Sequence, residues 1–240
     1  MTVRGWHLQR RDYFAQHPEW WALVLSAGAW IALPMLGQSH HAMAKGSTLL
    51  KSDAWEWALM TAAMMVPLTT ICLQTVALRS FWKRRHQAMA WFLAAYLTSW
   101  VAAGMLLSAA FRIVQQAEES GALLLSLAFI TAALWELCPM KTWALRQCHR
   151  TYPLAAVGWR ADWACLHFGI RHGLACIESC WALMLVPVAM GHSLPGMAGV
   201  GVIALAGRSQ WERKPRILAA GLLACAAAAY LAGSYRLTLI

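Results

Sequence analysis

Seven apolar runs, separated by polar or basic segments, dominate the pattern along the 240-residue chain. Most approach the roughly 20 residues that a helix needs to cross the ~30 Å hydrocarbon core of a bilayer. The expected spans are residues 20–36, 55–78, 88–113, 122–140, 172–190, 197–207 and 217–232. The sixth run is short and rich in glycine, so it is either a full span or a re-entrant segment. The pattern predicts an all-α fold, a polytopic transmembrane helix bundle of about seven spans.

Composition supports a membrane protein and argues against a soluble domain. Hydrophobic residues make up 60% of the chain, charged residues only 12%, and the mean hydropathy is +0.48. A soluble globular domain carries about 25% charged residues. The first apolar run is long enough to span and shows no clear small-residue cleavage site, so we expect no cleaved signal peptide. The expected organisation is an N-terminal segment, residues 1–19, followed by a single transmembrane helical domain, residues 20–240.

The basic residues predict the orientation of the chain. The formal net charge is +10, but the Lys and Arg residues are spread over loops, where they report topology rather than a nucleic-acid partner. With the N-terminus in the cytoplasm, only four of the 20 lie outside: Lys45, Lys51, Arg112 and Arg236. We therefore expect a multi-pass protein of the bacterial inner membrane, surrounded by lipid. Residues 141–170 form the longest cytoplasmic segment, and residues 141–149 are expected to form an amphipathic helix on the membrane surface.

The stretch Arg171–Met184, RHGLACIESCWALM, carries the most distinctive set of side chains. On a helix, neighbouring members of this set are four residues apart and share a face. The set consists of His172, Cys176, Cys180 and Met184. An imidazole, two thiols and a thioether are soft ligands, which favour Cu(I) and, to a lesser degree, Zn(II). The alternative is that Cys and Met serve here as ordinary buried side chains.

A second group of sulfur ligands lies in the second expected span, at MTAAMMVP. Met60 and Met64 are four residues apart, and Met65 follows them. Pro67 has no N–H, so the carbonyl of Ala63 loses its helical partner and the helix should kink. A freed carbonyl inside a membrane needs another donor. The alternative is again structural, because methionine fills irregular gaps in cores.

Sorted by expected depth, the soft ligands change from thioether outside to thiol and imidazole inside. The outer half holds Met60, Met64, Met65, Met184, Met190 and Met197, and the inner half holds Cys72, Cys138, His172, Cys176 and Cys180. A soft cation would pass inward along such a gradient, because a deprotonated thiol binds it more tightly. We expect Cys176, Cys180 and His172 as inner metal ligands. We expect Met60, Met64, Met65 and Met184 as outer ones.

Two carboxylates, Glu136 and Glu178, lie inside or at the edge of expected spans. Ionisable residues within a membrane are costly and by default suggest function. We expect Glu136 to reach the membrane interface near Lys141. Glu178 lies deeper, and it is equally compatible with a role in balancing a proton or cation and with a structural role.

At these same elements the chain resembles a bacterial family of predicted metal-binding integral membrane proteins, the domain of unknown function 2182 family. The matching elements are WALMTAAMMVP (57–67), AYLTSW (95–100), PMK with Cys148 (139–148) and GIRHGLACIESCWALM (169–184). The resemblance covers roughly residues 20–210. It implies that Met64, Met65, Cys176, Cys180, Trp181 and Met184 occupy motif positions, with His172 just before the last four.

Three functions stay open. The first is a protein that binds copper as Cu(I), with zinc as the second candidate, for delivery to a partner membrane or periplasmic metalloprotein; no catalytic residue is expected. The second is a membrane redox enzyme, which predicts a disulfide between helices such as Cys72 with Cys176. The third is a structural subunit whose polar stripe joins helices, since small and polar residues hold membrane helices together.

Overall fold

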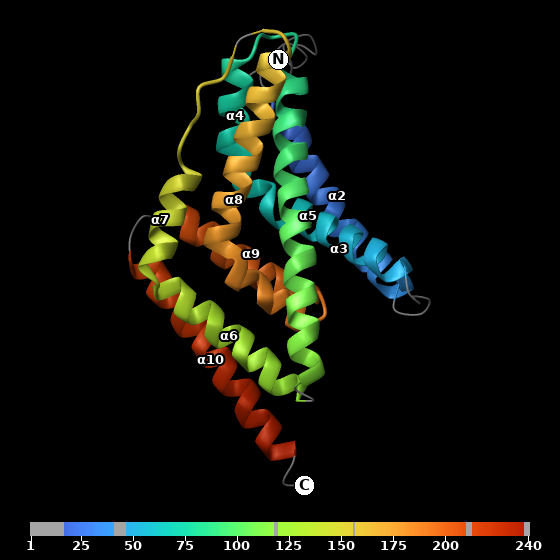
Figure 1. Cartoon of the computed structure of the whole chain (residues 1–240). Coiled ribbons are helices and arrows are strands. Elements are labelled where there is room, and N and C mark those ends of the chain that lie inside the picture. The colour runs from blue at the N-terminus through green and yellow to red at the C-terminus, as the bar shows by residue number, and fades with distance from the viewer. Residues whose placement is uncertain (1–16, 41–46, 118–119, 156, 210–212, 238–240) are drawn as a thin grey trace, which may run out of the picture. The chain divides into compact units, whose positions relative to one another are not determined.

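The computed structural model describes residues 17–40, 47–117, 120–155, 157–209 and 213–237, and most of these residues are helical (Figure 1). The elements are α2 (Trp20–His40), α3 (Ser47–Met65), the 3-10 turn η1 (Pro67–Thr69), α4 (Thr70–Arg79), α5 (Arg85–Ala117), α6 (Gly121–Leu137), α7 (Pro139–Cys148), α8 (Trp159–Ala189), α9 (Leu194–Ser209) and α10 (Arg213–Leu237). No strand occurs within those ranges. The predicted all-α class is confirmed.

Each expected span has a helical counterpart, but length and apolarity support membrane crossing for fewer of them. Helices α5 and α8 are each long and apolar enough to cross a bilayer. Two bent pairs pass the same test together: residues 53–65 with 67–79, bent by 49°, and α6 with α7, bent by 73°. The described part of the chain therefore contains two to four candidate spans. This supports a membrane protein, and the seven-span count stays a prediction.

Helix α8 begins at Trp159, well before the expected start of the fifth span at His172. The polar residues before His172 suggested a long loop, but they occupy one side of a helix. The other side buries Ala161, Cys165 and Phe168 at helical spacing. The amphipathic helix expected over residues 141–149 is present as α7.

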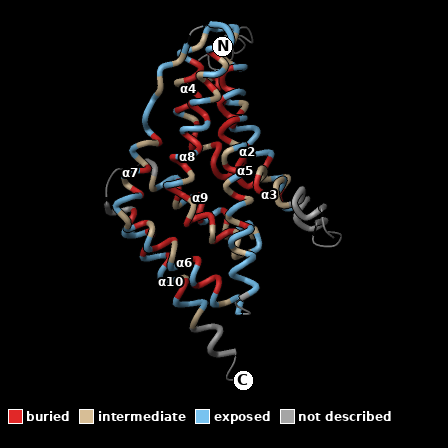
Figure 2. Tube along the Cα trace, in the orientation of Figure 1, coloured by how far each residue is buried: buried red, intermediate tan, exposed pale blue. Residues whose placement is uncertain are grey.

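The chain divides into two compact units. Unit 1 comprises Met1–Ser99 and Thr151–Gly173, and unit 2 comprises Trp100–Arg150 and Leu174–Ile240. Helices α5 and α8 contribute a part to each unit. In both units buried and exposed positions alternate along the helices, as Figure 2 shows, and residues 60–66 are buried without a break.

In unit 1, α2 packs along α3 at the kink that Pro67 predicted. The carbonyl oxygen of Ala63 accepts hydrogen bonds from Ser26 Oγ at 2.8 Å and from Trp30 Nε1 at 3.0 Å. These two donors replace the N–H that proline lacks. The expected bend and the expected replacement donor are both confirmed.

Also in unit 1, α5 and α8 approach each other closely at Gly169. A Cβ atom at this position would overlap with the carbonyl oxygen of Phe92, so only glycine fits without a shift. Next to it the rings of Phe92 and Phe168 pack with centroids 5.0 Å apart. Near the start of α8, Arg84 donates to Asp162 at 2.6 Å.

In unit 2, α6 and α10 pack along each other. The Ser126 hydroxyl lies 3.5 Å from the carbonyl oxygen of Ala227, and the rings of Phe129 and Tyr230 stack at 5.9 Å. A cavity of about 280 Å³ lies between α6, α8, α9 and α10, and apolar residues such as Met190 line it. Unit 2 thus has its own apolar interior.

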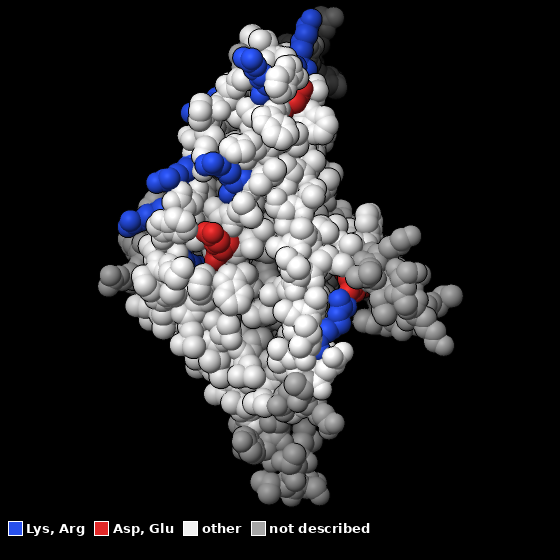
Figure 3. Space-filling view, in the orientation of Figure 1, with Lys and Arg blue, Asp and Glu red and all other residues white. Residues whose placement is uncertain are grey.

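Many large apolar side chains point outward from the helices. Examples from α2, α5, α6 and α10 are Ile31, Leu106, Leu134 and Leu218, each at least 63% exposed. Charged side chains are sparse on the face that Figure 3 shows. Extensive exposed apolar surface marks membrane or protein contacts, in agreement with the membrane character that the sequence predicts.

Candidate metal centre

The predicted soft-ligand stripe lies on one continuous helix, α8. The four side chains are buried, with exposures of 4% or less: His172, Cys176, Cys180 and Met184. Glu178, on the same helix, is exposed. The four-residue spacing therefore places the soft ligands on the buried side of α8, as predicted, and places Glu178 off that side.

Cys176 and Cys180 form a hydrogen-bonded pair of thiols in unit 2, which we call the dithiol site. Ser179 lies beside both of them. Its hydroxyl donates to the carbonyl oxygen of Cys176 at 2.9 Å and lies 3.4 Å from the sulfur of Cys180. Neither cysteine is in a disulfide, so each has a thiol that can lose its proton and bind a metal.

Cys148 of α7 is a third sulfur at this place, and the sequence did not predict it as a ligand. Its Sγ lies 3.9 Å from Ser179 Oγ, and the side chain is 2% exposed. The signal that could have found it is the spacing of Lys141, Ala144 and Cys148, which form the buried face of α7. We had expected that segment to lie on the membrane surface.

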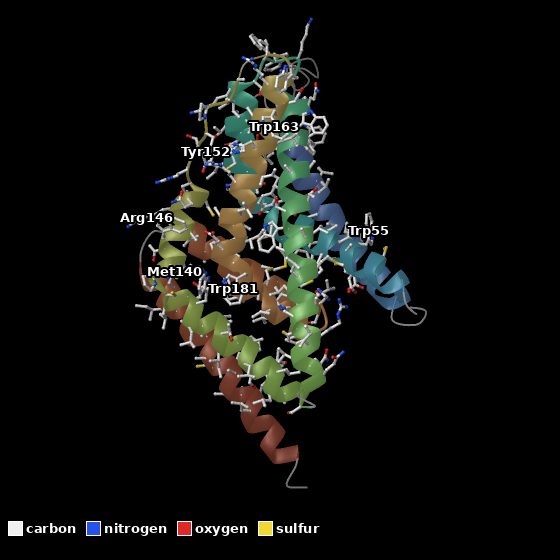
Figure 4. All side chains as sticks on the ribbon, in the orientation of Figure 1. Trp55, Met140, Arg146, Tyr152, Trp163 and Trp181 are labelled. Carbon is white, nitrogen blue, oxygen red and sulfur yellow. The ribbon has the colours of Figure 1, made fainter. Side chains whose placement is uncertain are left out.

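Two tryptophans connect α6 to the turn of α8 that carries the thiols. Trp135 Nε1 donates to the carbonyl oxygen of Ser179 at 3.3 Å. Its ring meets that of Trp181, which is labelled in Figure 4, edge to face, with centroids 5.2 Å apart. The motif residue Trp181 thus helps to hold α6 against the dithiol site.

Three buried charged residues of unit 2, Glu136, Lys141 and Arg216, form what we call the charged cluster. Lys141 Nζ donates to the carboxylate of Glu136. Arg216 donates to the carbonyl oxygens of Glu136 and Cys138, and also to Thr142 Oγ1 at 2.6 Å. The guanidinium therefore holds together the end of α6 and the first turn of α7.

Glu136 lies near Lys141, as expected, but its side chain is enclosed by the protein. Glu136 is 1% exposed and Lys141 is 2% exposed. The physical reason is the break at Cys138, where the chain turns by 73° between α6 and α7. This turn folds Lys141 back onto Glu136, so the lysine reaches the carboxylate inside the protein.

His172, a predicted inner ligand, pairs with Cys72 in unit 1. The sulfur of Cys72 lies 3.7 Å from Nδ1 and 3.8 Å from Nε2 of the imidazole. The rings of Phe92, Tyr96 and Phe168 surround the imidazole, with centroids 5.6–6.2 Å away. Neither Cys72 nor Cys176, the pair that a redox function predicts to be joined, is in a disulfide in this structure.

The predicted methionine ligands are also divided between the units. Met60, Met64 and Met65 lie on α3 in unit 1 and are buried, with exposures of 1%, 3% and 0%. Met184 belongs to unit 2 and follows Cys180 by one turn of α8. Of the predicted ligands, the structure pairs Cys176 with Cys180.

Unit 1 holds a buried carboxylate of a different kind, Glu19, just before α2. Burial raises the pKa of Glu19, but hydrogen bonds from Gln74, from its own backbone N–H and from His17 together outweigh burial. The net result holds the pKa of this carboxyl below its ordinary value of 4.5. Hydrogen bonds, first from Gln74, together with the electrostatic effect of His17, therefore stabilise the charge without a Lys or Arg.

The donor set of the dithiol site consists of soft sulfur atoms. Among the residues that the structure describes, no three or more His, Cys, Asp or Glu side chains gather as a metal site. Structural Zn(II) sites are almost always four-coordinate. Cu(I) accepts fewer ligands, and thiolate and thioether ligands select it. Two thiols with a thioether one turn away meet that requirement.

Comparisons with known proteins agree with this chemistry. A family model described as PpoB2, copper chaperone, matches residues 54–232. No curated protein and no solved structure was found to match the chain. The matched range includes the dithiol site, the charged cluster and the Cys72–His172 pair. The resemblance to the domain of unknown function 2182 family stays a prediction.

Proposed function

Because the chain belongs to the PpoB2 family of copper chaperones, we propose that it is a membrane protein that binds Cu(I) at the dithiol site and delivers it to a partner metalloprotein. The ligands are the thiolates of Cys176 and Cys180, with the thioether of Met184 on the next turn. The observation that carries this proposal is the burial, within the matched range, of two thiols that are hydrogen-bonded to each other and are not in disulfides.

Binding at this site is a proton exchange without a redox step. Each thiol loses its proton to solvent as its sulfur binds the ion, because the thiolate is the metal ligand. The product is Cu(I) held by two thiolates, and the copper keeps its oxidation state. Burial keeps bulk water away from the bound ion.

Delivery then requires that sulfur ligands exchange one at a time. Cys148 is placed for such an exchange, because its sulfur and that of Cys180 both lie beside the Ser179 hydroxyl, at 3.9 Å and 3.4 Å. In the last exchange, a soft ligand of the partner protein would replace a sulfur ligand of this chain. We propose His172, Met60, Met64 and Met65 of unit 1 as further metal ligands, apart from the dithiol site.

Elemental analysis by mass spectrometry tests this function. The full chain is purified anaerobically in detergent after growth with ample copper and zinc, as wild type and as Cys176→Ser/Cys180→Ser. We expect near-stoichiometric copper in the wild type and its loss in the double variant. Two matched controls, Cys165→Ser in a buried position and Cys225→Ser in an exposed one, keep their copper. Metal-free wild type, or a double variant that retains copper, contradicts the proposal.

A further inference from the structure

The charged cluster buries more positive than negative charge. It contains one carboxylate, Glu136, and two cationic side chains, Lys141 and Arg216, with exposures of 1%, 2% and 9%. In the described part of unit 2 no other Asp, Glu, Lys or Arg is buried. An uncompensated buried charge is costly, so the cluster calls for an anion close by.

One donor of the cluster is still unused. The Nη atoms of Arg216 donate to Glu136, Cys138 and Thr142. Its Nε is buried and has no hydrogen-bond partner among the described residues. An excess of positive charge together with an unpaired donor indicates that the cluster stabilises a negative charge nearby.

The dithiol site is where that negative charge arises. Lys141 lies on the same buried face of α7 as Cys148, whose sulfur lies 3.9 Å from Ser179 Oγ. Lys141 is also close enough to the thiol of Cys180 to interact with it electrostatically. Protonated thiols are neutral, so the anion appears only when the thiols give up their protons to a metal.

We propose that the charged cluster makes the dithiol site selective for a monovalent metal ion, with Lys141 as the residue that sets this preference. Two thiolates holding Cu(I) carry one excess negative charge, which offsets the positive excess of the cluster. Two thiolates holding Zn(II) are neutral, so that excess stays uncompensated. In both cases the two thiol protons leave to solvent, and no electron is transferred. The inference rests on the proposed function, because it takes the thiolates of Cys176 and Cys180 as ligands.

The test is a pair of anaerobic competition titrations on the full chain in detergent, with a chromophoric chelator for Cu(I) and another for Zn(II). Lys141→Gln should lower the preference for Cu(I) over Zn(II) about tenfold or more, the effect of one charge over roughly 10 Å at an effective dielectric constant of about 20. Glu136→Gln/Lys141→Gln removes one charge of each sign and should return the preference to within about threefold of wild type. Arg146→Gln, an exposed change on the same helix, should leave it unaltered.

An unaltered preference in Lys141→Gln overturns the inference, and so does a double variant that behaves like Lys141→Gln. Thermal unfolding identifies the variants that fold. Should Lys141→Gln fail to fold, Glu136→Gln serves as the test. Its larger excess of positive charge should raise the preference for Cu(I) over Zn(II), and an unchanged preference overturns the inference. Cys176→Ser/Cys180→Ser in the same assay separates the two proposals. Wild type that binds no Cu(I) through these thiols overturns the proposed function, whereas thiol-bound Cu(I) with an unaltered Lys141→Gln preference overturns the charge-based inference alone.

Discussion

Unit 1 and unit 2 each bury a pair of soft side chains, but the two pairs differ in the charge that they acquire on binding a metal. In unit 1 the pair is the thiol of Cys72 and the imidazole of His172, 3.7 Å apart at Nδ1. A thiolate and a neutral imidazole form a neutral complex with Cu(I). The surroundings match, because aromatic rings contact the imidazole and no buried Lys or Arg occurs among the described residues of this unit.

In unit 2 the pair is the two thiols of the dithiol site, and a complex with Cu(I) carries a negative charge. Here the surroundings contain the charged cluster with its positive excess. The comparison teaches that residue type alone does not define a soft-metal site in a membrane helix bundle. The charge of the loaded site must also agree with the charge buried around it, since an uncompensated charge in a low-dielectric interior is costly.

The largest expected effect, on Cu(I) affinity, comes from replacing one cysteine in each pair. Cys180→Ser should lower the Cu(I) affinity by more than about 100-fold, because even changes to groups behind a metal ligand cost about 10–100-fold. Cys72→Ser, in the other unit, should change the affinity of the dithiol site less than about threefold. Chelator competition on both variants, with Cys225→Ser as control, measures this difference. An equal loss in Cys72→Ser and Cys180→Ser would show one shared site and remove the comparison.

The next effect disturbs the packing of unit 1 without touching the dithiol site. Gly169→Ala places a methyl group against the carbonyl oxygen of Phe92 and should destabilise the fold by about 1–3 kcal/mol. Gly28→Ala, on α2, meets nothing within 4 Å and should be neutral or stabilising by up to about 1 kcal/mol. Thermal unfolding gives the stabilities, and elemental analysis gives copper per folded protein. Copper lost from a fully stable Gly169→Ala would contradict the independence of the two pairs.

A smaller effect tests the kink that shapes unit 1. Ser26→Ala removes one of the two donors to the Ala63 carbonyl and should cost about 1 kcal/mol of folding stability. In a Pro67→Ala background the chain regains a backbone N–H for that carbonyl, so the same change should cost less. A double-mutant cycle by thermal unfolding measures the difference. Equal costs in both backgrounds would mean that Ser26 does not replace the missing N–H.

The smallest effect concerns the buried carboxylate of unit 1, Glu19, which is stabilised without a Lys or Arg. Hydrogen bonds hold the pKa of Glu19 below 4.5, its ordinary value in the unfolded chain. Its contribution to stability is therefore fully present above that pH and is lost as the pH falls through the lower, folded-state pKa. Glu19→Gln should remove this part of the acid dependence, measured as melting temperature against pH. A curve identical to wild type would contradict the assignment.

Local features of the chain were predictable because they depend on neighbouring residues. The apolar runs predicted the helices. Pro67 predicted both the bend and the need of the Ala63 carbonyl for another hydrogen-bond donor. The four-residue spacing in α8 predicted that Cys176 and Cys180 share the buried side of that helix. Helix periodicity and the missing proline N–H act within a few residues, so the sequence by itself determined them.

The tertiary structure decided what surrounds these residues. It paired His172 with Cys72, 100 positions away in the chain, and it brought Arg216 to the carbonyl oxygen of Glu136 across 80 positions. It also buried Cys148 beside Ser179 and enclosed Lys141 with Glu136. Burial and charge balance are sums over contacts between distant segments. For that reason the sequence by itself predicted the two thiols, whereas the positive charge of Lys141 and Arg216 depends on the packing of α6, α7 and α10 in unit 2.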